Sequence, residues 1–541
     1  MPIFMSWTLR MCLILGIAVV RLFAQNADPL SDPWTLGLAF RRVLQDSIPL
    51  QQIVLWPAPL AGLPELLPSV EQPPYAAWHN SPPHAGFQLF PNIGRHRFLA
   101  TVSDSLFHLI ANLSFMSRGG HIRYGDTSSS FLLARLGIQA FFRYGKHAEG
   151  FLDVSNGARL AGIPEAAARV DPSLGRTLKF SIEARRYFDR YAGYVQLRWG
   201  KARVRFGREA LSIGYSPIDN LILSPQAPML DGLLLDLVHN HVRFSYLHAS
   251  AEGTDTAGLP VRSKYIALHR IGWEPMPGLS FALYDMIVYS GRGLDFSYLN
   301  PLAFFVSAGL QTTEKSNQDN SLLALEMALR PRQGSLLYGT LLVDDINYST
   351  LFDTTTAGNS NKFAFQIGAV GLLPISTMGL QVALEYVRIA PFVFTHRTIV
   401  NSWTHLNAPL GYDMQPNSDR WALQLRYWIA PRITLTTSID YTRHGENFLG
   451  PDGRLLTEVR NGVVLPIGNV GGNVLRGDGD VLAPNRFLRG KRSDTRRFHL
   501  QLAAEWLPNV ISFFTVGYFN RTGGNFPLQQ LWGTLEFRFG Y

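Results

Sequence analysis

The stretch LWGTLEFRFGY, from Leu531 to Tyr541, alternates between apolar and polar side chains. The apolar parity holds Leu531, Leu535, Phe537, Phe539 and Tyr541, and the polar parity holds Thr534, Glu536 and Arg538. Neighbouring side chains of a β-strand point to opposite faces of the sheet, so this pattern predicts a strand with one apolar face. The sequence therefore ends on an amphipathic strand.

Residues 1–24 have the layout of a secretory signal peptide. Arg10 precedes the apolar core MCLILGIAVV (Met11–Val20), and Ala24 offers a small residue for cleavage. This core is too short to cross a bilayer as a helix. The only cysteine, Cys12, lies in the same segment, so we expect the mature chain to carry neither a disulfide nor thiol chemistry.

Charge and hydropathy narrow the class of protein. The net charge of +9 becomes +7 when Arg10 and Arg21 leave with the signal peptide. In an exported chain this modest excess does not favour nucleic acid as a partner, whereas lipid phosphates and acidic glycans remain plausible. No apolar run after the signal approaches eighteen residues, so the chain is either a large secreted soluble protein or a β-barrel membrane protein.

From about Phe131 onward, apolar side chains recur at every second position. In WALQLRYWI (Trp421–Ile429), for example, Leu425 belongs to the apolar face and Gln424 to the other. Strands of roughly ten residues can cross a membrane when they are tilted. We count eighteen of them, at 131–144, 148–155, 178–188, 191–199, 202–209, 229–238, 241–248, 264–273, 278–289, 321–330, 334–345, 362–372, 378–388, 420–429, 432–442, 495–506, 510–520 and 531–541.

The connections between these strands alternate between two lengths. The short ones are IAPR, LPN, LLPIS, RPRQG, EPMPG and WGK, and the long ones span 210–228, 249–263, 290–320, 346–361, 389–419 and 443–494. Outer-membrane barrels have short periplasmic turns and long outer loops. The pattern therefore predicts an all-β fold, a transmembrane antiparallel β-barrel over residues 106–541 in the cell outer membrane, with its long loops outside.

The two ends of the chain fit the same architecture. The last strand is expected to close the barrel against the first, because an open edge in lipid leaves unpaired backbone groups that cost several kcal/mol each. A final strand that ends on Tyr541 resembles the signal read by the barrel assembly machinery, which is therefore an expected partner. Residues 25–105 are proline-rich with one candidate helix, Trp34–Ser47, and we interpret them as a periplasmic or plug region.

Residues Phe206–Tyr348 resemble the Wzi-type family of capsule-assembly outer-membrane proteins. The similar stretches are FGREALSIGYSPIDNLILSPQAPMLDGLLLDL, KYIALHRIGWEPMPGLSFALYDMIVYSGRGLDFSYLNPLAFF with its Tyr298–Pro301 loop, DNSLLALEMALRP and LYGTLLVDDINY. The resemblance implies an eighteen-stranded barrel with a role in polysaccharide binding or surface assembly. Family members carry several helices before the barrel, whereas this chain has a proline-rich region there. Related barrels are also linked to gliding motility, so the fold does not fix the role.

No sequence motif points to catalysis. The fourteen histidines are scattered, and neither H-E-x-x-H nor G-x-S-x-G occurs. We therefore predict no enzymatic activity, no catalytic residues and no cofactor. Asp344 and Asp345 could hold a calcium ion together with loop carbonyls, but a solvated strand end is the favoured interpretation, so no metal site is predicted.

Basic residues recur on the polar parity of three consecutive predicted strands. They are Lys179, Arg185, Arg198, Arg203 and Arg205. In a barrel this face lines the lumen, so the pattern predicts a basic ladder along one wall, with Glu183 and Glu209 neutralising part of it. Two interpretations stay open, a surface that attracts anions and a network of ion pairs that fills the lumen.

A second basic cluster, NRFLRGKRSDTRR (Asn485–Arg497), is expected outside the membrane. Its candidate binding residues Arg489, Lys491 and Arg492 could meet lipopolysaccharide phosphates or acidic polysaccharide, or could form an ordinary solvated loop. Among the aromatic residues of the long loops, Tyr298 and Trp403 are candidate platforms for sugar rings. They could equally pack the loops over the barrel mouth.

These observations lead to a functional hypothesis. The chain is predicted to be an outer-membrane barrel that binds, or assists the assembly of, surface polysaccharide of the capsular or exopolysaccharide kind. A porin-like channel for anionic solutes and a structural part of a surface or gliding-motility complex are the alternatives. Outer-membrane lipid and lipopolysaccharide are expected partners, and nucleic acid is not.

Overall fold

The computed structural model describes residues 50, 55–56 and 86–89, and then most of the chain from 99 to 540. Within that long span the gaps are 172–173, 175–185, 256–257, 310–317, 346–361, 376–378, 431, 462, 478–485 and 508–509. The predicted signal peptide, the candidate helix Trp34–Ser47 and the terminal Tyr541 lie outside the described residues.

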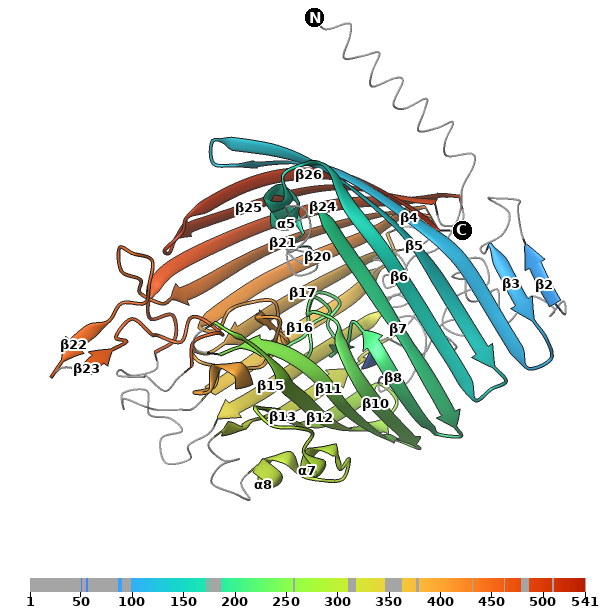
Figure 1. Cartoon of the computed structure of the whole chain (residues 1–541), viewed down its shortest axis with the longest axis horizontal. Helices are drawn as coiled ribbons and strands as arrows, with labels where there is room; N and C mark the ends of the chain where they lie inside the picture. Colours follow the sequence, from blue (N-terminus) through green and yellow to red (C-terminus); the bar gives the residue numbers. More distant parts are fainter. Residues whose placement is uncertain are drawn as a thin grey trace, which may run out of the picture.

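The chain forms a closed antiparallel β-barrel of eighteen strands (Figure 1). The barrel strands are β4 (Phe107–Tyr124), β5 (Thr127–Tyr144), β6 (Ala148–Gly162), β7 (Tyr187–Trp199), β8 (Ala202–Glu209), β10 (Leu230–His239), β11 (Val242–Thr254), β12 (Pro260–Met276), β13 (Leu279–Ser290), β14 (Asn320–Leu329), β15 (Ser335–Asp345), β16 (Lys362–Leu373), β17 (Leu380–Ile389), β20 (Ser418–Ala430), β21 (Ile433–Glu446), β24 (Lys491–Leu507), β25 (Val510–Gly523) and β26 (Leu528–Gly540). Each strand pairs with the next, and β26 pairs with β4 to close the ring, as predicted for the last strand.

Two errors in the predicted strand list offset each other. The prediction omits β4, whose outward positions beyond Phe115 are Ser117, Gly119 and His121, too small or polar to show an apolar alternation. It also divides β7 into two strands at Asp189 and Arg190, whereas Tyr187–Trp199 is one continuous strand. The count therefore stays at eighteen, and every strand from β8 onward keeps its predicted direction. Residues 178–185 lie outside the described part.

The alternation of side chains identifies the two faces of the barrel correctly. On β26, Leu531, Leu535 and Phe537 point outward and are exposed, whereas Thr534 and Glu536 are buried inside. The same pattern around the ring produces an outer apolar belt. Members of this belt, from five of the strands, include Leu136, Ile138, Phe206, Leu283, Ile367 and Trp421. A belt of exposed apolar side chains is the surface that a membrane-spanning barrel presents to lipid.

The two ends of the barrel differ in the length of their connections. At the end that we call the turn end, the strands are joined by 145–147, 200–201, 240–241, 277–278, 330–334, 374–379, 431–432 and 508–509. At the opposite loop end, the connections are 163–186, 210–229, 291–319, 346–361, 390–417 and 447–490, with short ones at 125–126, 255–259 and 524–527. All six predicted short connections lie at the turn end. The predicted long loop 249–263 is wrong, because β11 and β12 continue through most of it.

Smaller elements lie beside or within the ring. They are β1 (Leu55–Trp56), which pairs with β9 (Ser212–Ile213), β2 (Gly86–Leu89), β3 (Ala100–Ser103), α5 (Pro164–Val170), α7 (Phe296–Leu299), α8 (Phe305–Gly309), η5 (Ile399–Asn401), β18 (Thr404–His405), β19 (Ala408–Pro409), β22 (Glu458–Arg460) and β23 (Val463–Leu465). β3 pairs with the start of β4, beyond the point where β26 ends. None of the described helices is long and apolar enough to cross a membrane.

The assignment of faces can be tested on β20. Leu425→Arg should impair folding into lipid, because an arginine on the lipid face near the midplane costs roughly 2–4 kcal/mol. Gln424→Arg should be mild, since position 424 faces the lumen. Heat-modifiability of the protein in outer-membrane extracts reports the folded fraction, and equal damage from the two substitutions would contradict the assignment.

Candidate functional site at the loop end of the barrel

Several of the long connections fold back into the barrel. The helix α5 of the connection 163–186 packs on inward residues of β4, β5 and β7, and Val474 of the connection 447–490 joins the larger cluster described next. Residues 210–229 and 390–417 carry side chains that join one buried apolar cluster with lumen-facing residues of β10 to β17. Leu221, Trp403 and Tyr412 from these loops are 0–1% exposed. Both segments are therefore part of the core, and they fill the lumen along this half of the ring.

A carboxylate on β17 holds both loops. Glu385 accepts hydrogen bonds from the hydroxyls of Tyr338 and Tyr412 and from the Gln366 amide, each at 2.7 Å. The same Gln366 amide nitrogen donates to the Asp219 carbonyl at 2.7 Å. The loop 210–229 and the loop 390–417 thus meet on three neighbouring strands, which supply Tyr338, Gln366 and Glu385. We call this set the Glu385 hub.

Gly368 makes the hub possible. This glycine lies on β16 between Tyr338 and Glu385 in the register of the sheet. A Cβ atom at position 368 would stand 2.3 Å from the Tyr338 ring. The absent side chain therefore leaves the space across which the tyrosine reaches the carboxylate.

A lysine on β12 and an asparagine on β14 attach the loop 390–417 to the barrel wall. Lys264 on β12 is 0% exposed and its Nζ donates to the carbonyls of Ser402 and Thr404 at 2.9 and 2.6 Å. The Asn320 side chain on β14 donates to the Asn401 carbonyl at 3.0 Å. Buried polar groups need such partners, so these contacts fix the loop in one position.

His405 links the two loops to the barrel. Its Nδ1 accepts the backbone N–H of Glu252 at 2.9 Å, which assigns the proton to Nε2, and Nε2 donates to the Met229 carbonyl at 3.1 Å. Burial, together with the nearby positive charges of Arg208 and Lys264, lowers the pKa of His405 to about 4. The imidazole is therefore neutral at physiological pH and serves as a structural contact.

The predicted basic cluster lies at the loop end, where the connection 447–490 enters β24. We define the basic loop patch as Arg489, Lys491 and Arg492. Lys491 and Arg492 are exposed and Arg489 is half-buried. Arg492 donates to Asp494 at 2.7 Å. The Asn417 side chain anchors the patch by donating to the Arg489 carbonyl and accepting from the Leu488 N–H, both at 2.7 Å.

Arg198 and Arg203 lie at the turn end, on either side of the connection 200–201. Arg198 approaches Glu149 at 3.9 Å. Arg203 pairs with Asp236, which also accepts from Arg243 at 2.6 Å. These two arginines are thus at the opposite end of the barrel from the basic loop patch, and both have carboxylate neighbours.

Arg205 lies inside the lumen wall and is 2% exposed. It donates to Glu209 at 3.0 Å and to Gln196 at 2.9 Å, and its guanidinium lies 4.1 Å from the centre of the Tyr194 ring. This geometry matches the interpretation of the basic ladder as a network of ion pairs. The remaining predicted members, Lys179, Glu183 and Arg185, lie outside the described residues.

Tyr298 and Trp403 are buried, at 0% and 1% exposure. The Tyr298 hydroxyl donates to Asp319 at 2.7 Å, and the Trp403 indole N–H donates to the Ile222 carbonyl at 3.1 Å. Neither ring offers a free face to a sugar here. Their environment fits the alternative that these aromatic residues pack the loops.

The prediction of a solvated strand end is wrong for Asp344, which is buried and faces inward. Its carboxylate accepts the backbone N–H of Phe394 from the loop 390–417, so it acts as another attachment point for that loop. Within the described ranges, no group of three or more histidine, cysteine, aspartate or glutamate side chains gathers as metal ligands do.

The comparisons with known proteins concern the fold. No protein-family model and no curated protein matches this sequence. Among solved structures, Wzi of Escherichia coli, an outer membrane protein involved in group 1 capsule assembly and a carbohydrate-binding β-barrel, matches with a TM-score of 0.54 and 12% identity over 95% of this chain and 99% of that chain. OprD of Pseudomonas aeruginosa matches with a TM-score of 0.42 and 11% identity, over 80% of this chain and 95% of that chain. OpdQ of the same organism matches with a TM-score of 0.43 and 9% identity, over 80% of this chain and 97% of that chain. The closed barrel resembles outer membrane proteins of Gram-negative bacteria, which supports an outer-membrane location.

The Glu385 hub predicts how the loops can be released. Glu385→Leu removes the acceptor from the buried hydroxyls of Tyr338 and Tyr412 and from one N–H of Gln366, and each unsatisfied donor costs about 1–3 kcal/mol. Both loops should then leave the lumen while the ring stays closed. Limited proteolysis should cut within 210–229 and 390–417 faster than in the wild type. Glu385→Gln keeps one acceptor oxygen and should have the smaller effect; equal cleavage of all three proteins would contradict the role of the hub.

Asp219 predicts a pH dependence of loop docking. Burial raises its pKa to about 7 from an ordinary value of 3.8, against the opposing effect of its hydrogen bonds from Ser224 and Asp413. The docked loop therefore holds a proton between about pH 4 and 7 that the released loop does not. Docking should weaken as the pH rises through this window and level off above it. Hydrogen exchange of residues 210–229, corrected for intrinsic rates, should show less protection at pH 8 than at pH 5, and Asp219→Asn should remove most of the difference.

Proposed function

We propose that this protein is a non-enzymatic outer-membrane barrel that binds surface polysaccharide or assists its assembly. The observation that carries the proposal is the docking of residues 210–229 and 390–417 inside the lumen by the Glu385 hub and Lys264. Loops that are held in this way form a fixed platform at one end of the barrel. Such a platform suits the binding of a polymer better than the passage of solutes.

The basic loop patch supplies the attraction for an acidic polymer. Its three side chains lie at the end with the long connections, which in outer-membrane barrels is the extracellular end. Exposed positive charge raises the local concentration of a polyanion and speeds its association. Asn417 ties the patch to the docked loop 390–417, so the charge is presented from a defined position.

The likeness to Wzi is consistent with this function. It extends over nearly the whole of both chains, and that protein is a carbohydrate-binding barrel involved in capsule assembly. At 12% identity the likeness concerns the fold, so the function of this chain rests on its own residues and on the experiment below.

A channel for anionic solutes is the second candidate. The observation that favours it is a set of lumen-facing arginines on the half of the ring away from the docked loops. They are Arg118, Arg135, Arg190, Arg426, Arg497 and Arg538. Arg118 and Arg538 share Glu536, Arg118 also pairs at 2.7 Å with Asp171 of the connection 163–186, and Arg497 lies 3.7 Å from Asp440. An arginine-lined wall of this kind attracts anions if water has access to it.

The basic loop patch should be needed to retain polysaccharide. Replacing Arg489, Lys491 and Arg492 together with serine should reduce the amount of cell-associated acidic polysaccharide. The difference from wild type should shrink at high salt, because exposed charges are screened beyond about 8 Å at physiological ionic strength. The barrel should stay folded, since surface substitutions usually shift stability by less than about 0.5 kcal/mol.

A matched control removes the same charge from the opposite end. Lys146, Lys201 and Arg332 are exposed in connections at the turn end, and their replacement with serine should leave retention unchanged. Full retention by the loop variant, or equal loss in both variants, would overturn the polysaccharide role. Planar-bilayer recordings on the same proteins test the second candidate, which predicts steady anion-selective currents in the wild type.

A further inference from the structure

The connection between β13 and β14 covers part of the outer face of the barrel. On β13 the side chains that point out of the barrel are those of Leu283, Asp285, Ile287 and Tyr289. Leu283 is 61% exposed, whereas Ile287 and Tyr289 are 0% exposed. The difference arises because α7 and α8 lie outside the ring, against the wall of β11 to β13 (Figure 1). We call residues Leu294–Gly309 the outer flap.

Specific contacts hold the outer flap against the wall. The Phe305 ring stacks on His269 with 3.9 Å between their centres, and the Tyr298 ring lies 5.0 Å from Tyr289. The Phe305 backbone N–H donates to Asp285 Oδ2 at 2.6 Å. The flap therefore covers the outward-pointing polar side chains of His269 and Asp285 near the loop end of β12 and β13.

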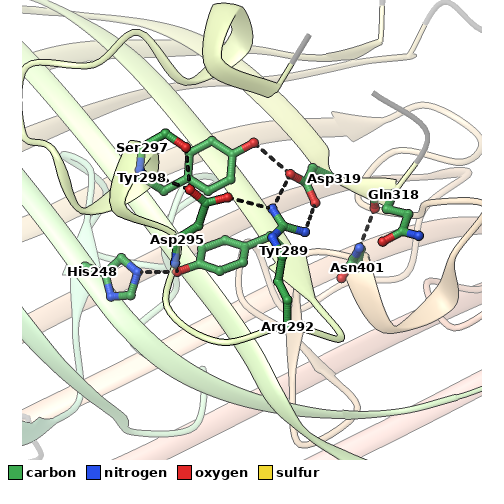
Figure 2. A network of polar contacts seen from close by, with 9 residues as sticks. All are labelled: His248, Tyr289, Arg292, Asp295, Ser297, Tyr298, Gln318, Asp319 and Asn401. Atoms are coloured by element: carbon green, nitrogen blue, oxygen red, sulfur yellow. Dashed lines mark hydrogen bonds and ion pairs between the residues drawn. The ribbon is translucent and has the colours of Figure 1, made fainter. Parts of the chain in front are cut away.

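The charged groups at the start of the flap and beside it form ion pairs with one another. Figure 2 shows Arg292 between Asp295 and Asp319, with the Tyr298 hydroxyl also directed at Asp319. His248 lies 2.9 Å from the Tyr289 hydroxyl beneath them. From position 296 to 309 the sequence FSYLNPLAFFVSAG contains no charged residue. The flap therefore packs aromatic rings and a few hydrogen-bonding groups against the barrel, and its side away from the barrel is uncharged.

The side of the flap away from the barrel is apolar and exposed. Leu294, Phe296, Leu302 and Phe304 are 53, 84, 87 and 55% exposed. Isolated exposed apolar residues are common on proteins, but four on one short segment form a patch that calls for a partner. This patch begins where the outer apolar belt of the same strands, represented by Leu283, ends.

We propose that the outer flap lies in the lipid leaflet on the loop side of the membrane and that Phe296, Leu302 and Phe304 contact acyl chains. Continuity with the belt identifies lipid as the occupant, because the belt already faces the membrane. The absence of charge over 296–309 fits contact with acyl chains, because charged side chains are costly in hydrocarbon. The flap also keeps lipid away from His269 and Asp285, whose polar groups would otherwise face acyl chains.

Spin labels can locate the flap relative to the membrane. Cys12 is the only cysteine, so in a Cys12→Ser background Phe296→Cys and Leu302→Cys each provide a single labelling site. The labelled proteins are reconstituted in dioleoylphosphatidylcholine vesicles. Collision of the nitroxide with oxygen, which partitions into lipid, is compared with collision with a water-soluble nickel chelate. The ratio of oxygen to nickel collisions should be several-fold higher than for Val459→Cys.

Two controls make the result decisive. Val459 is an exposed apolar residue on β22 at the loop end, at 67% exposure, and should report water. Leu283→Cys in the outer apolar belt should report lipid. A flap label that behaves like the one at 459 overturns the proposal, and so does a label shielded from both reagents, which indicates a protein partner. If Leu283→Cys itself reports water, the membrane placement is wrong, and that outcome is independent of polysaccharide binding.

Discussion

Pairing of β26 with β4 is the contact on which the rest of the structure depends. The two strands run antiparallel from Ser114 to Tyr124 and from Gln530 to Gly540, and Arg118 stands directly opposite Glu536 across this seam. In lipid no water can satisfy an unpaired strand edge, so the sheet has to close on itself. Once it is closed, every strand divides its side chains between a lumen and a belt. The apolar belt, the inward polar residues and the two unequal ends all follow from that geometry.

The lumen is built differently on its two halves. Along β11, β13 and β14 many inward positions carry alanine, among them Ala249, Ala282 and Ala324, and these small side chains leave room for the docked loops. The half formed by β4 to β7 and β20 to β26 carries inward arginine, glutamine and carboxylate side chains beside larger apolar ones such as Phe141 and Phe151. An all-apolar lumen would not hold the loops in a defined position, because apolar contacts are not directional. The Glu385 hub and Lys264 supply directional hydrogen bonds that fix the position of the loops.

Much of the fold can be predicted from the sequence because the side-chain period of a strand is two. WALQLRYWI and LWGTLEFRFGY each show both faces, and proline-bearing turns such as RPRQG mark one end of the barrel. β4 escapes this logic since its outward positions near the loop end are Ser117, Gly119 and His121. β7 appears divided because Asp189 and Arg190 look like a turn, although Arg190 points into the lumen.

The candidate site is harder to predict because it depends on contacts between residues far apart in the chain. The only signal for the Glu385 hub is polar residues at inward positions of three consecutive strands, and nothing local shows that Asp219 and Tyr412 meet there. Similarly, the basic face of Arg203 and Arg205 and the nearby carboxylate of Glu209 can be predicted from the strand pattern, but the pairing of Arg203 with Asp236 on the next strand cannot. Burial of Tyr298 and Trp403 likewise depends on loops whose course has no period.

The Glu385 hub has a consequence for the order in which the molecule is built. Its side chains come from β15, β16 and β17, and Gly368 admits the Tyr338 ring only when these strands are in register. The loop 210–229 precedes those strands by more than a hundred positions, so it has no place to dock while they are unpaired. The docking of this loop at the hub therefore requires β15, β16 and β17 to be paired in the correct register first.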